Sequence, residues 1–175
     1  ICKKYVPEKI VSTYNENYVD NGIKFNATNM DFEETIESLS SCKKAILLLA
    51  DRHPNNCFKN REYTNLLNVT SIKKILNYLK KYDIKPVFIS SDFVFNGISG
   101  SYSEKDKPQP VVLYGSQKLE IENYIQSNFT KYLIFRVAKV FSSETEKAVS
   151  HFGDFLTTIE NNDEIYAAVD QIYSP

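Results

Sequence analysis

The chain has 175 residues, of which 42% are hydrophobic and 25% are charged, and its formal net charge is −1. These values are typical of a soluble globular domain with a sizeable core, and they exclude a general attraction to nucleic acid or to an anionic membrane. No apolar run approaches the roughly 20 residues of a membrane span and no signal peptide is visible, so we expect a cytoplasmic protein without nucleic-acid or membrane partners.

Apolar strands alternate with amphipathic helices along the chain. Strands are predicted at 9–13, 45–50, 86–91, 132–137 and 165–169, and helices at 30–39, 65–79, 116–126 and 152–159. The run 45–50 contains no polar residue, which is typical of a strand buried on both faces. This order predicts an α/β fold, a Rossmann-like doubly wound parallel sheet, whose ligands lie beyond the carboxyl ends of the strands.

The cysteines and histidines show no pattern of their own. Cys2, Cys42 and Cys57 are odd in number, far apart and without a Cys-x-x-Cys pair, so they are predicted to be reduced thiols. His53 and His151 have no metal-ligand spacing with a cysteine or a carboxylate cluster. The sequence therefore predicts no metal site.

The chemistry is concentrated in one stretch of the chain. Ser90 and Ser91 close an apolar strand, and Tyr114 and Lys118 come later, four residues apart, in a helical segment. One helical turn separates such positions, so the phenol and the ammonium share a face. A second Tyr-x-x-x-Lys match at 5–9 contains a proline and has no predicted strand before it. A tyrosine beside a lysine and facing a serine can protonate a carbonyl oxygen while a hydride arrives from elsewhere.

Three motifs in order carry a resemblance to a known family. They are Ser-Ser-Asp-Phe-Val-Phe-Asn-Gly at 90–97, Tyr-x-Glu-x-Asp-x-Pro-x-Pro at 102–110, and Tyr-Gly-x-x-Lys at 114–118. They resemble the extended short-chain dehydrogenase/reductases, and within these the dTDP-4-dehydrorhamnose reductase group, whose Asp-Gln-x-x-Ser-Pro element is similar to residues 170–175. The resemblance implies NAD(P)H-dependent reduction of a 4-keto-6-deoxy sugar nucleotide, as in dTDP-rhamnose and polysaccharide biosynthesis.

The resemblance also implies a role for each site residue. Tyr114 would be the general acid and Ser91 the hydroxyl that polarises the carbonyl. Lys118 would lower the phenol's pKa from its usual value near 10 and hydrogen-bond the nicotinamide ribose. The implied cofactor-binding residues are Ala50, Asn68, Ser90, Tyr114, Lys118, Val137 and Ala138. The implied substrate-binding residues are Ser91, Asp92, Phe93 and Tyr114.

Several of these residues keep a structural alternative. The strand-end hydroxyls can cap backbone groups, and Asp92 can form a turn. Arg136, at the end of a predicted strand, can equally make a structural ion pair. The carboxylates Glu104 and Asp106 stand among prolines, which favours a rigid lid over an acid/base pair.

The cofactor preference is predicted from the residues just after the first predicted strand. Tyr14, Asn15 and Glu16 stand where relatives that prefer NAD place an acidic residue on the ribose. The serine, threonine and asparagine side chains nearby tolerate a 2′-phosphate, which favours NADP(H) over NAD(H), and Glu16 leaves NAD(H) open. The chain has five glycines, and none of them forms the family's glycine-rich pyrophosphate turn.

That missing turn predicts an incomplete domain. We expect residues 1–175 to form a single, partial NAD(P)-binding domain that lacks the first strand, with the start of the substrate region near 163–175. Two other functions stay open: an epimerase or dehydratase of the same superfamily, and a non-catalytic nucleotide-binding relative such as the regulatory subunit of methionine adenosyltransferase. The expected partner is a nucleotide-sugar substrate, and a homodimer is compatible with the sequence.

Overall fold

The computed structural model describes residues 10–35 and 41–138. By its internal contacts the chain divides into two compact units, Ile1–Arg136 and Val137–Pro175. The helix predicted at 152–159 and the strand predicted at 165–169 lie outside the described residues. Within the described residues, no helix is long and apolar enough to cross a membrane.

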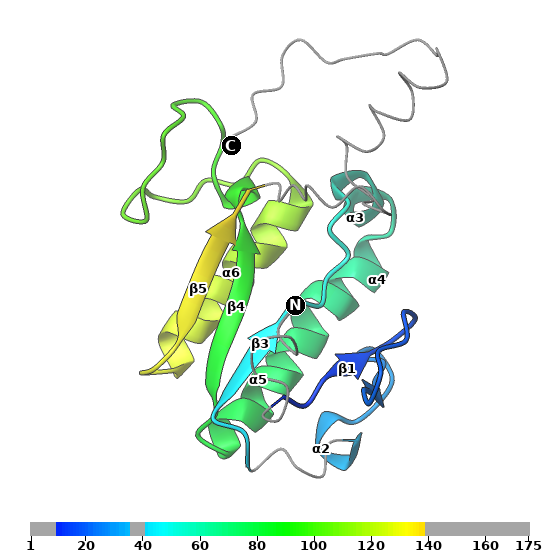
Figure 1. Ribbon diagram of the computed structural model, residues 1–175. Helices are drawn as coiled ribbons and strands as arrows, with labels where there is room; N and C mark the ends of the chain where they lie inside the picture. Colours follow the sequence, from blue (N-terminus) through cyan, green and yellow to red (C-terminus); the bar gives the residue numbers. More distant parts are fainter. Residues whose placement is uncertain (1–9, 36–40, 139–175) are drawn as a thin grey trace, which may run out of the picture. The chain divides into compact units, whose positions relative to one another are not determined.

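The described strands form two small sheets. β3 (Lys44–Leu47), β4 (Lys85–Ser91) and β5 (Leu133–Val137) form one sheet in the order β3-β4-β5. β3 and β4 pair in parallel, and Figure 1 shows all three arrows pointing the same way. The second sheet is a parallel pair of two-residue strands, β1 (Thr13–Tyr14) and β2 (Ile23–Lys24). The prediction of an α/β fold with parallel strands is confirmed.

A long helical stretch connects β3 to β4 in four consecutive pieces. These are α3 (Pro54–Lys59), α4 (Arg61–Asn65), the π-helix η3 (Leu66–Ser71) and α5 (Ile72–Lys81). The predicted helix at 65–79 therefore begins too late. The segment 54–64 is too polar for an apolar period to reveal it, although a proline is well suited to the first turn of a helix.

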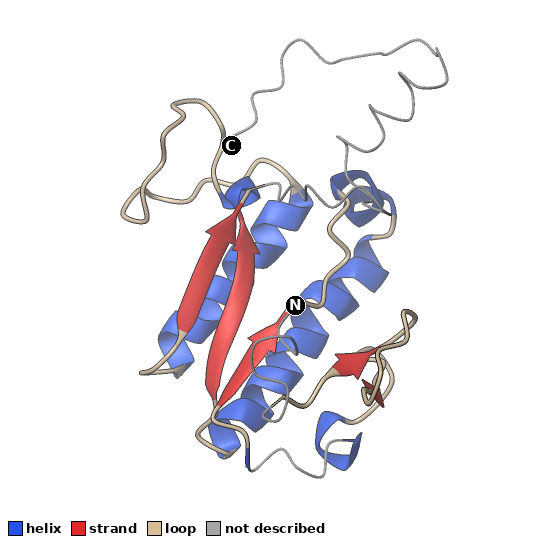
Figure 2. Ribbon diagram, viewed as in Figure 1, coloured by secondary structure: helices blue, strands red, loops and turns tan. Residues whose placement is uncertain are grey.

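The hydrophobic core lies between the β3–β4–β5 sheet and the helices α5 and α6 (Leu113–Asn128) (Figure 2). α5 places apolar residues at helical spacing on its buried face, and α6 contributes two isoleucines. The central members of the core are Leu47, Ile72, Ile75, Leu76, Leu79, Phe88, Ile121 and Ile125. Because α5 and α6 both pack against β4, this strand is held firmly at the centre of the structure.

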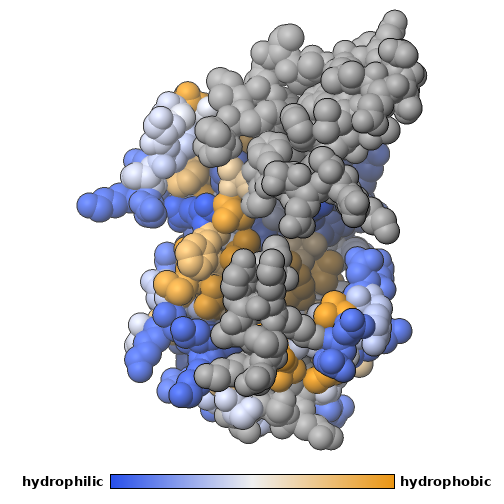
Figure 3. Space-filling view, in the orientation of Figure 1, coloured by the Kyte–Doolittle hydropathy of each residue, from blue (hydrophilic) through white to orange (hydrophobic). Residues whose placement is uncertain are grey.

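The opposite face of this sheet carries exposed apolar side chains. On β3 and just after it, Ile46 is 53% exposed and Leu48 is 73% exposed. Leu133 and Phe135 on β5 are also exposed. Figure 3 shows hydrophobic residues gathered on this side of the molecule. The expectation that the run 45–50 is buried on both faces is therefore wrong for the described residues, because α5 and α6 cover one face only.

The first described region departs most from the prediction. The strand expected at 9–13 is reduced to Thr13–Tyr14, and its partner Ile23–Lys24 is too short for a sequence pattern to reveal. The helix expected at 30–39 begins at Phe32 in α2 (Phe32–Thr35), and residues 36–40 lie outside the described residues. The strands expected at 86–91 and 132–137 agree with β4 and β5 to within one residue, and α6 begins three residues earlier than predicted.

Candidate active site

Tyr114 and Lys118 lie one turn apart on the buried face of α6. Tyr114 is 7% exposed and Lys118 is 4% exposed. The Lys118 ammonium lies 5.6 Å from the centroid of the Tyr114 ring and 4.7 Å from that of Phe88. Its Nζ donates a hydrogen bond of 2.9 Å to the carbonyl oxygen of Ile89 on β4. The shared face predicted from the spacing is therefore present, and the ammonium is anchored to the strand beside it.

Gly115 allows this face of α6 to approach the chain segment just after β4. A Cβ atom at this position would lie 2.0 Å from the carbonyl oxygen of Phe93 and 2.8 Å from its carbonyl carbon. Such a contact with backbone atoms cannot be relieved by rotating a side chain. The glycine in Tyr114-Gly115 is thus a requirement of packing, which brings Tyr114 against the 3₁₀ turn η4 (Asp92–Val94).

The turn η4 places the other predicted site residues. Ser91 precedes the turn, and its Oγ accepts a hydrogen bond from the Phe93 backbone N–H (3.2 Å) and donates one to Asp92 Oδ1 (2.8 Å). The Phe93 ring makes an edge contact with the Tyr114 ring, at 6.0 Å between centroids. Ser91 therefore caps the turn, as its structural alternative predicted, and the turn holds Asp92 and Phe93 beside Tyr114.

The pKa values correct one part of the sequence prediction. Burial, and to a smaller extent the negative charge of the Cys57 thiolate, raise the pKa of Tyr114 to about 12. Arg52 lowers it, but not enough to offset burial. Burial also lowers the pKa of Lys118 to about 8, and the Glu122 carboxylate opposes that shift. The expectation of a phenol pKa below its usual value is wrong here, because desolvation outweighs the attraction of the Arg52 cation.

Asn68 is buried, but its amide binds protein groups. Its Oδ1 accepts from the backbone N–H of Asp51 (2.8 Å), and its Nδ2 donates to the Asp51 carbonyl (2.9 Å) and to Gln117 Oε1 (2.8 Å). Asn68 thus ties the chain after β3 to α6. It lies in the π-helix η3, a geometry that is often found at functional sites. Asn68 therefore binds the protein's own groups, and its role toward a cofactor stays a prediction.

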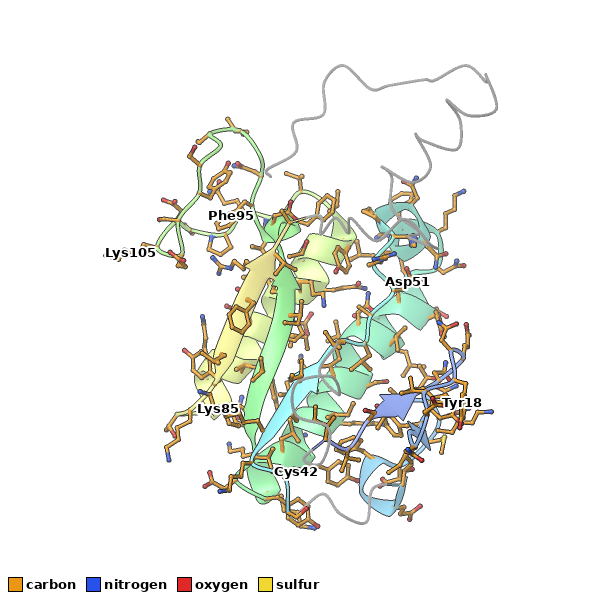
Figure 4. All side chains as sticks on the ribbon, viewed as in Figure 1. Tyr18, Cys42, Asp51, Lys85, Phe95 and Lys105 are labelled. Atoms are coloured by element: carbon orange, nitrogen blue, oxygen red, sulfur yellow. The ribbon has the colours of Figure 1, made fainter. Side chains whose placement is uncertain are left out.

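The remaining predicted residues lie at or just after the carboxyl ends of their strands. Ala50 belongs to the loop after β3, Val137 is the last residue of β5, and Ala138 is next to it. Ser90 is buried on β4, and its Oγ has no hydrogen-bond partner among the described residues. Figure 4 shows Asp51 and Phe95 at this end of the sheet, and Cys42 and Lys85 at the other end.

Sequence reasoning missed four residues around this site. Arg52 and Cys57 act on the Tyr114 phenol, and Gln117 accepts a hydrogen bond from Asn68. Glu122, one turn after Lys118, is 1% exposed and forms an ion pair with Arg136, which fulfils the structural alternative given for that arginine. Of these four residues, only Glu122 could have been predicted from the sequence. It follows Tyr114 and Lys118 at the same four-residue interval, so it lies on the same helical face.

A second polar region lies where β1 and β2 end. A pocket of about 710 Å³ is lined by Asn15, Glu16, Lys24, Asn26, Asn29 and Met30. Two of these residues, Asn15 and Glu16, come directly after β1, at the position from which the cofactor preference was predicted. The pocket presents an acidic and a basic side chain to the same space, so it can interact with either a ribose hydroxyl or an anionic group.

The family is established by a match that covers most of the chain. Residues 23–175 match the family model described as the RmlD substrate binding domain. The chain belongs to this family. This membership confirms the resemblance to extended short-chain dehydrogenase/reductases.

Curated relatives fall into two groups. The beta subunit of methionine adenosyltransferase 2 from Xenopus tropicalis is 32% identical over 92 residues, which are 53% of this chain and 28% of that protein. The dTDP-4-dehydrorhamnose reductase of Escherichia coli K12 is 26% identical over 146 residues, which are 82% of this chain and 48% of that protein. The matched part of the chain thus spans less than half the length of either relative.

Solved structures of similar proteins share the fold. A hypothetical dTDP-4-dehydrorhamnose reductase from Sulfolobus tokodaii superposes with a TM-score of 0.69 at 25% identity, over 81% of this chain and 52% of that one. The reductase of the same name from Bacillus anthracis Ames, in complex with NADP, superposes with a TM-score of 0.66 at 20% identity, over 80% of this chain and 49% of that one.

Proposed function

We propose that this chain carries the catalytic centre of an NAD(P)H-dependent reductase acting on a 4-keto-6-deoxy sugar nucleotide, with Tyr114 as the proton donor. The observation that supports this most is the buried pair of Tyr114 and Lys118, packed against the Ser91–Asp92–Phe93 turn at the carboxyl end of β4. The match to a family with reductase members supports the substrate class.

The described residues fit the nicotinamide half of the cofactor. The buried Ser90 Oγ has no protein partner among them, and the one hydrogen bond described for Lys118 Nζ, to Ile89, uses one of its three N–H donors. These groups, together with Ala50 in the loop after β3, would hold the nicotinamide and its ribose. When bound, the reduced nicotinamide supplies the hydride. We infer NADP(H) as the preferred form, because Lys24 and Asn15 line the pocket beyond β1 and β2 and can receive a 2′-phosphate.

The protein's own residues supply the proton and the orientation. Tyr114, whose pKa is about 12, holds its proton at neutral pH and can give it to the oxygen of the substrate carbonyl. The Ser91 hydroxyl, now turned to Asp92, can rotate to donate a hydrogen bond to the same oxygen. The Lys118 and Arg52 cations offset the phenolate that forms, and Phe93, which is partly exposed, can contact the sugar. The carbonyl carbon gains the hydride and the oxygen gains the proton, so the product is an alcohol.

Replacing Tyr114 by phenylalanine tests this assignment. NADPH oxidation in the presence of dTDP-4-dehydrorhamnose should fall by about 10²–10⁴-fold, the usual contribution of a general acid. Tyr124→Phe, on the same helix but outside the site, should retain the rate of the unaltered protein. Turnover that survives in Tyr114→Phe would overturn the assignment.

The second candidate is a non-catalytic regulatory relative, which is favoured by the match to the beta subunit of methionine adenosyltransferase 2. This alternative predicts that the unaltered protein binds NADPH but oxidises none of it with the sugar nucleotide. It also predicts that Tyr114→Phe changes neither property. An epimerase or dehydratase would convert the sugar nucleotide without net consumption of the cofactor.

A further inference from the structure

The buried ion pair of Glu122 and Arg136 lies next to Lys118 in α6. The Glu122 carboxylate is 1% exposed and receives three hydrogen bonds from Arg136 on β5: Nε to Oε1 (3.1 Å), Nε to Oε2 (3.2 Å) and Nη2 to Oε2 (2.7 Å). This bidentate arrangement fixes the plane of the carboxylate and not only its charge. Glu122 lies one helical turn after Lys118 on the same face of α6, so its orientation is set relative to the ammonium.

Arg136 is itself held in place. Its guanidinium lies over the Phe95 ring, 5.0 Å from the centroid, and the Phe95 ring stacks on Tyr102 at 4.4 Å with an angle of 5° between the planes. The Tyr102 hydroxyl donates to Asn96 Oδ1 (2.6 Å) and accepts from the Ser99 backbone N–H (3.0 Å). The loop between β4 and α6 therefore contributes a stack of rings that fixes Arg136, and Arg136 fixes Glu122.

The Glu122–Arg136 pair affects the protonation of Lys118 as well as the packing of α6. Burial favours the neutral amine of Lys118, and Glu122 is the charged group that favours its ammonium form. On β4, Lys118 faces a ring and a carbonyl group, from Phe88 and Ile89. Four other ionisable groups affect the pKa of the neighbouring Tyr114 and are not among the causes of the Lys118 shift. They are Asp51, Arg52, Cys57 and Asp92.

We propose that Glu122 is a positioning residue for Lys118: held by Arg136, its carboxylate keeps the buried lysine in its charged form beside Tyr114. The meaning of that charge for turnover rests on the proposed reductase function, whereas the effect of Glu122 on the protonation of Lys118 does not. A purely structural ion pair would stabilise the fold and leave the protonation of Lys118 unchanged.

The test is a titration of Lys118 by NMR, with ¹³C-labelled lysine and a Lys118→Met sample to assign the Cε signal. The variant is Glu122→Gln, which removes the carboxylate charge and leaves the Arg136 cation in place. We expect its Lys118 midpoint to move down by about one pH unit, the effect of losing a close opposite charge. Arg136→Met removes a like charge instead and should not lower the midpoint. Glu120→Gln, whose partner Lys73 is partly exposed, is the matched control and should leave the midpoint in place.

A folded Glu122→Gln variant with the same Lys118 midpoint as the unaltered protein would overturn the proposal, and so would a lowered midpoint in Arg136→Met. If the protein is an active reductase, its rate should begin to fall at a lower pH on the alkaline side of the profile, in step with the lower Lys118 midpoint. A purely structural ion pair would leave that pH unchanged. A midpoint that moves in a protein without reductase activity would support the positioning role and reject the proposed function. Reductase activity together with an unchanged Lys118 midpoint would support the proposed function and reject the positioning role.

Discussion

Charged side chains are buried in one region of the molecule and exposed in another. The buried region lies at the carboxyl ends of β4 and β5, and the exposed one lies at the carboxyl ends of β1 and β2. In the first region Lys118, Glu122 and Arg136 are largely removed from solvent, and the carboxylate is held by paired hydrogen bonds. In the second region Glu16 and Lys24 line an open polar pocket. Since a charge interacts more strongly where water is excluded, the first region can set the chemistry of a site. The second can adjust affinity by small amounts.

The largest effect should come from breaking the buried pair. Glu122→Gln leaves the Arg136 guanidinium without its partner in the interior, which should lower the free energy of unfolding by about 3–5 kcal/mol. Glu120→Gln, two residues earlier on α6, removes an exposed pair with Lys73 (2.5 Å) and should cost at most about 1 kcal/mol. Urea unfolding of both variants measures the difference. Equal losses would mean that burial of the pair has no energetic weight.

Next in size is the amide that joins the chain after β3 to α6. Asn68→Ala removes the partner of the Asp51 N–H, the Asp51 carbonyl and the Gln117 side chain, and should cost about 3 kcal/mol. Asn65→Ala, at an exposed position at the end of α4, should cost less than about 0.5 kcal/mol. Thermal unfolding compares the two variants, and a small loss for Asn68→Ala would show that water replaces its hydrogen bonds.

A smaller effect should appear in the dependence of stability on pH. The pKa of Lys118 is lowered from 10.5 to about 8 in the folded chain. Between these values the unfolded chain retains a proton that the folded chain has released, so the free energy of unfolding rises with pH. Lys118 by itself should contribute a gain of about 2 kcal/mol from pH 8 to pH 10, and the raised pKa of the Cys57 thiol opposes part of it above about pH 9.

Lys118→Met should lose this gain, and Lys73→Met, at a partly exposed position, should keep it. Denaturant unfolding at several pH values measures the slope. The pH values used for these measurements should not exceed about 10, because the raised pKa of Tyr114 lowers stability between pH 10 and about 12. A slope that is the same in Lys118→Met and in the unaltered protein would contradict the burial of this charge.

The smallest effect belongs to the open pocket. Lys24→Met should weaken NADPH binding by about two- to fivefold and leave NADH binding unchanged, because an exposed charge contributes at most about 1 kcal/mol. Glu16→Gln should weaken NADH in preference to NADPH, since its carboxylate can accept hydrogen bonds from the ribose hydroxyls. Calorimetric titration with each cofactor measures both variants. Equal weakening of both cofactors by Lys24→Met would contradict a role in selecting the 2′-phosphate.

The amino-acid sequence by itself determined the parts that depend on local spacing. Alternating apolar segments predicted the parallel α/β fold, and the four-residue interval between Tyr114 and Lys118 placed both on one helical face. These predictions succeed because the periods of strands and helices are properties of the backbone. The strands next to the site were located for the same reason.

Only the tertiary structure decided which groups neighbour the site from distant parts of the chain. Asn68 binds Asp51 and Gln117 across intervals of 17 and 49 residues, and Glu122 meets Arg136 on another element. The pKa of Tyr114 likewise depends on how deeply α6 is buried and on Cys57 and Arg52, which come from other segments. Burial and long-range pairing arise when the chain packs, so no local pattern carries them. The sequence could point to Tyr114 and Lys118 as a pair on one helical face, and packing alone set their electrostatic surroundings.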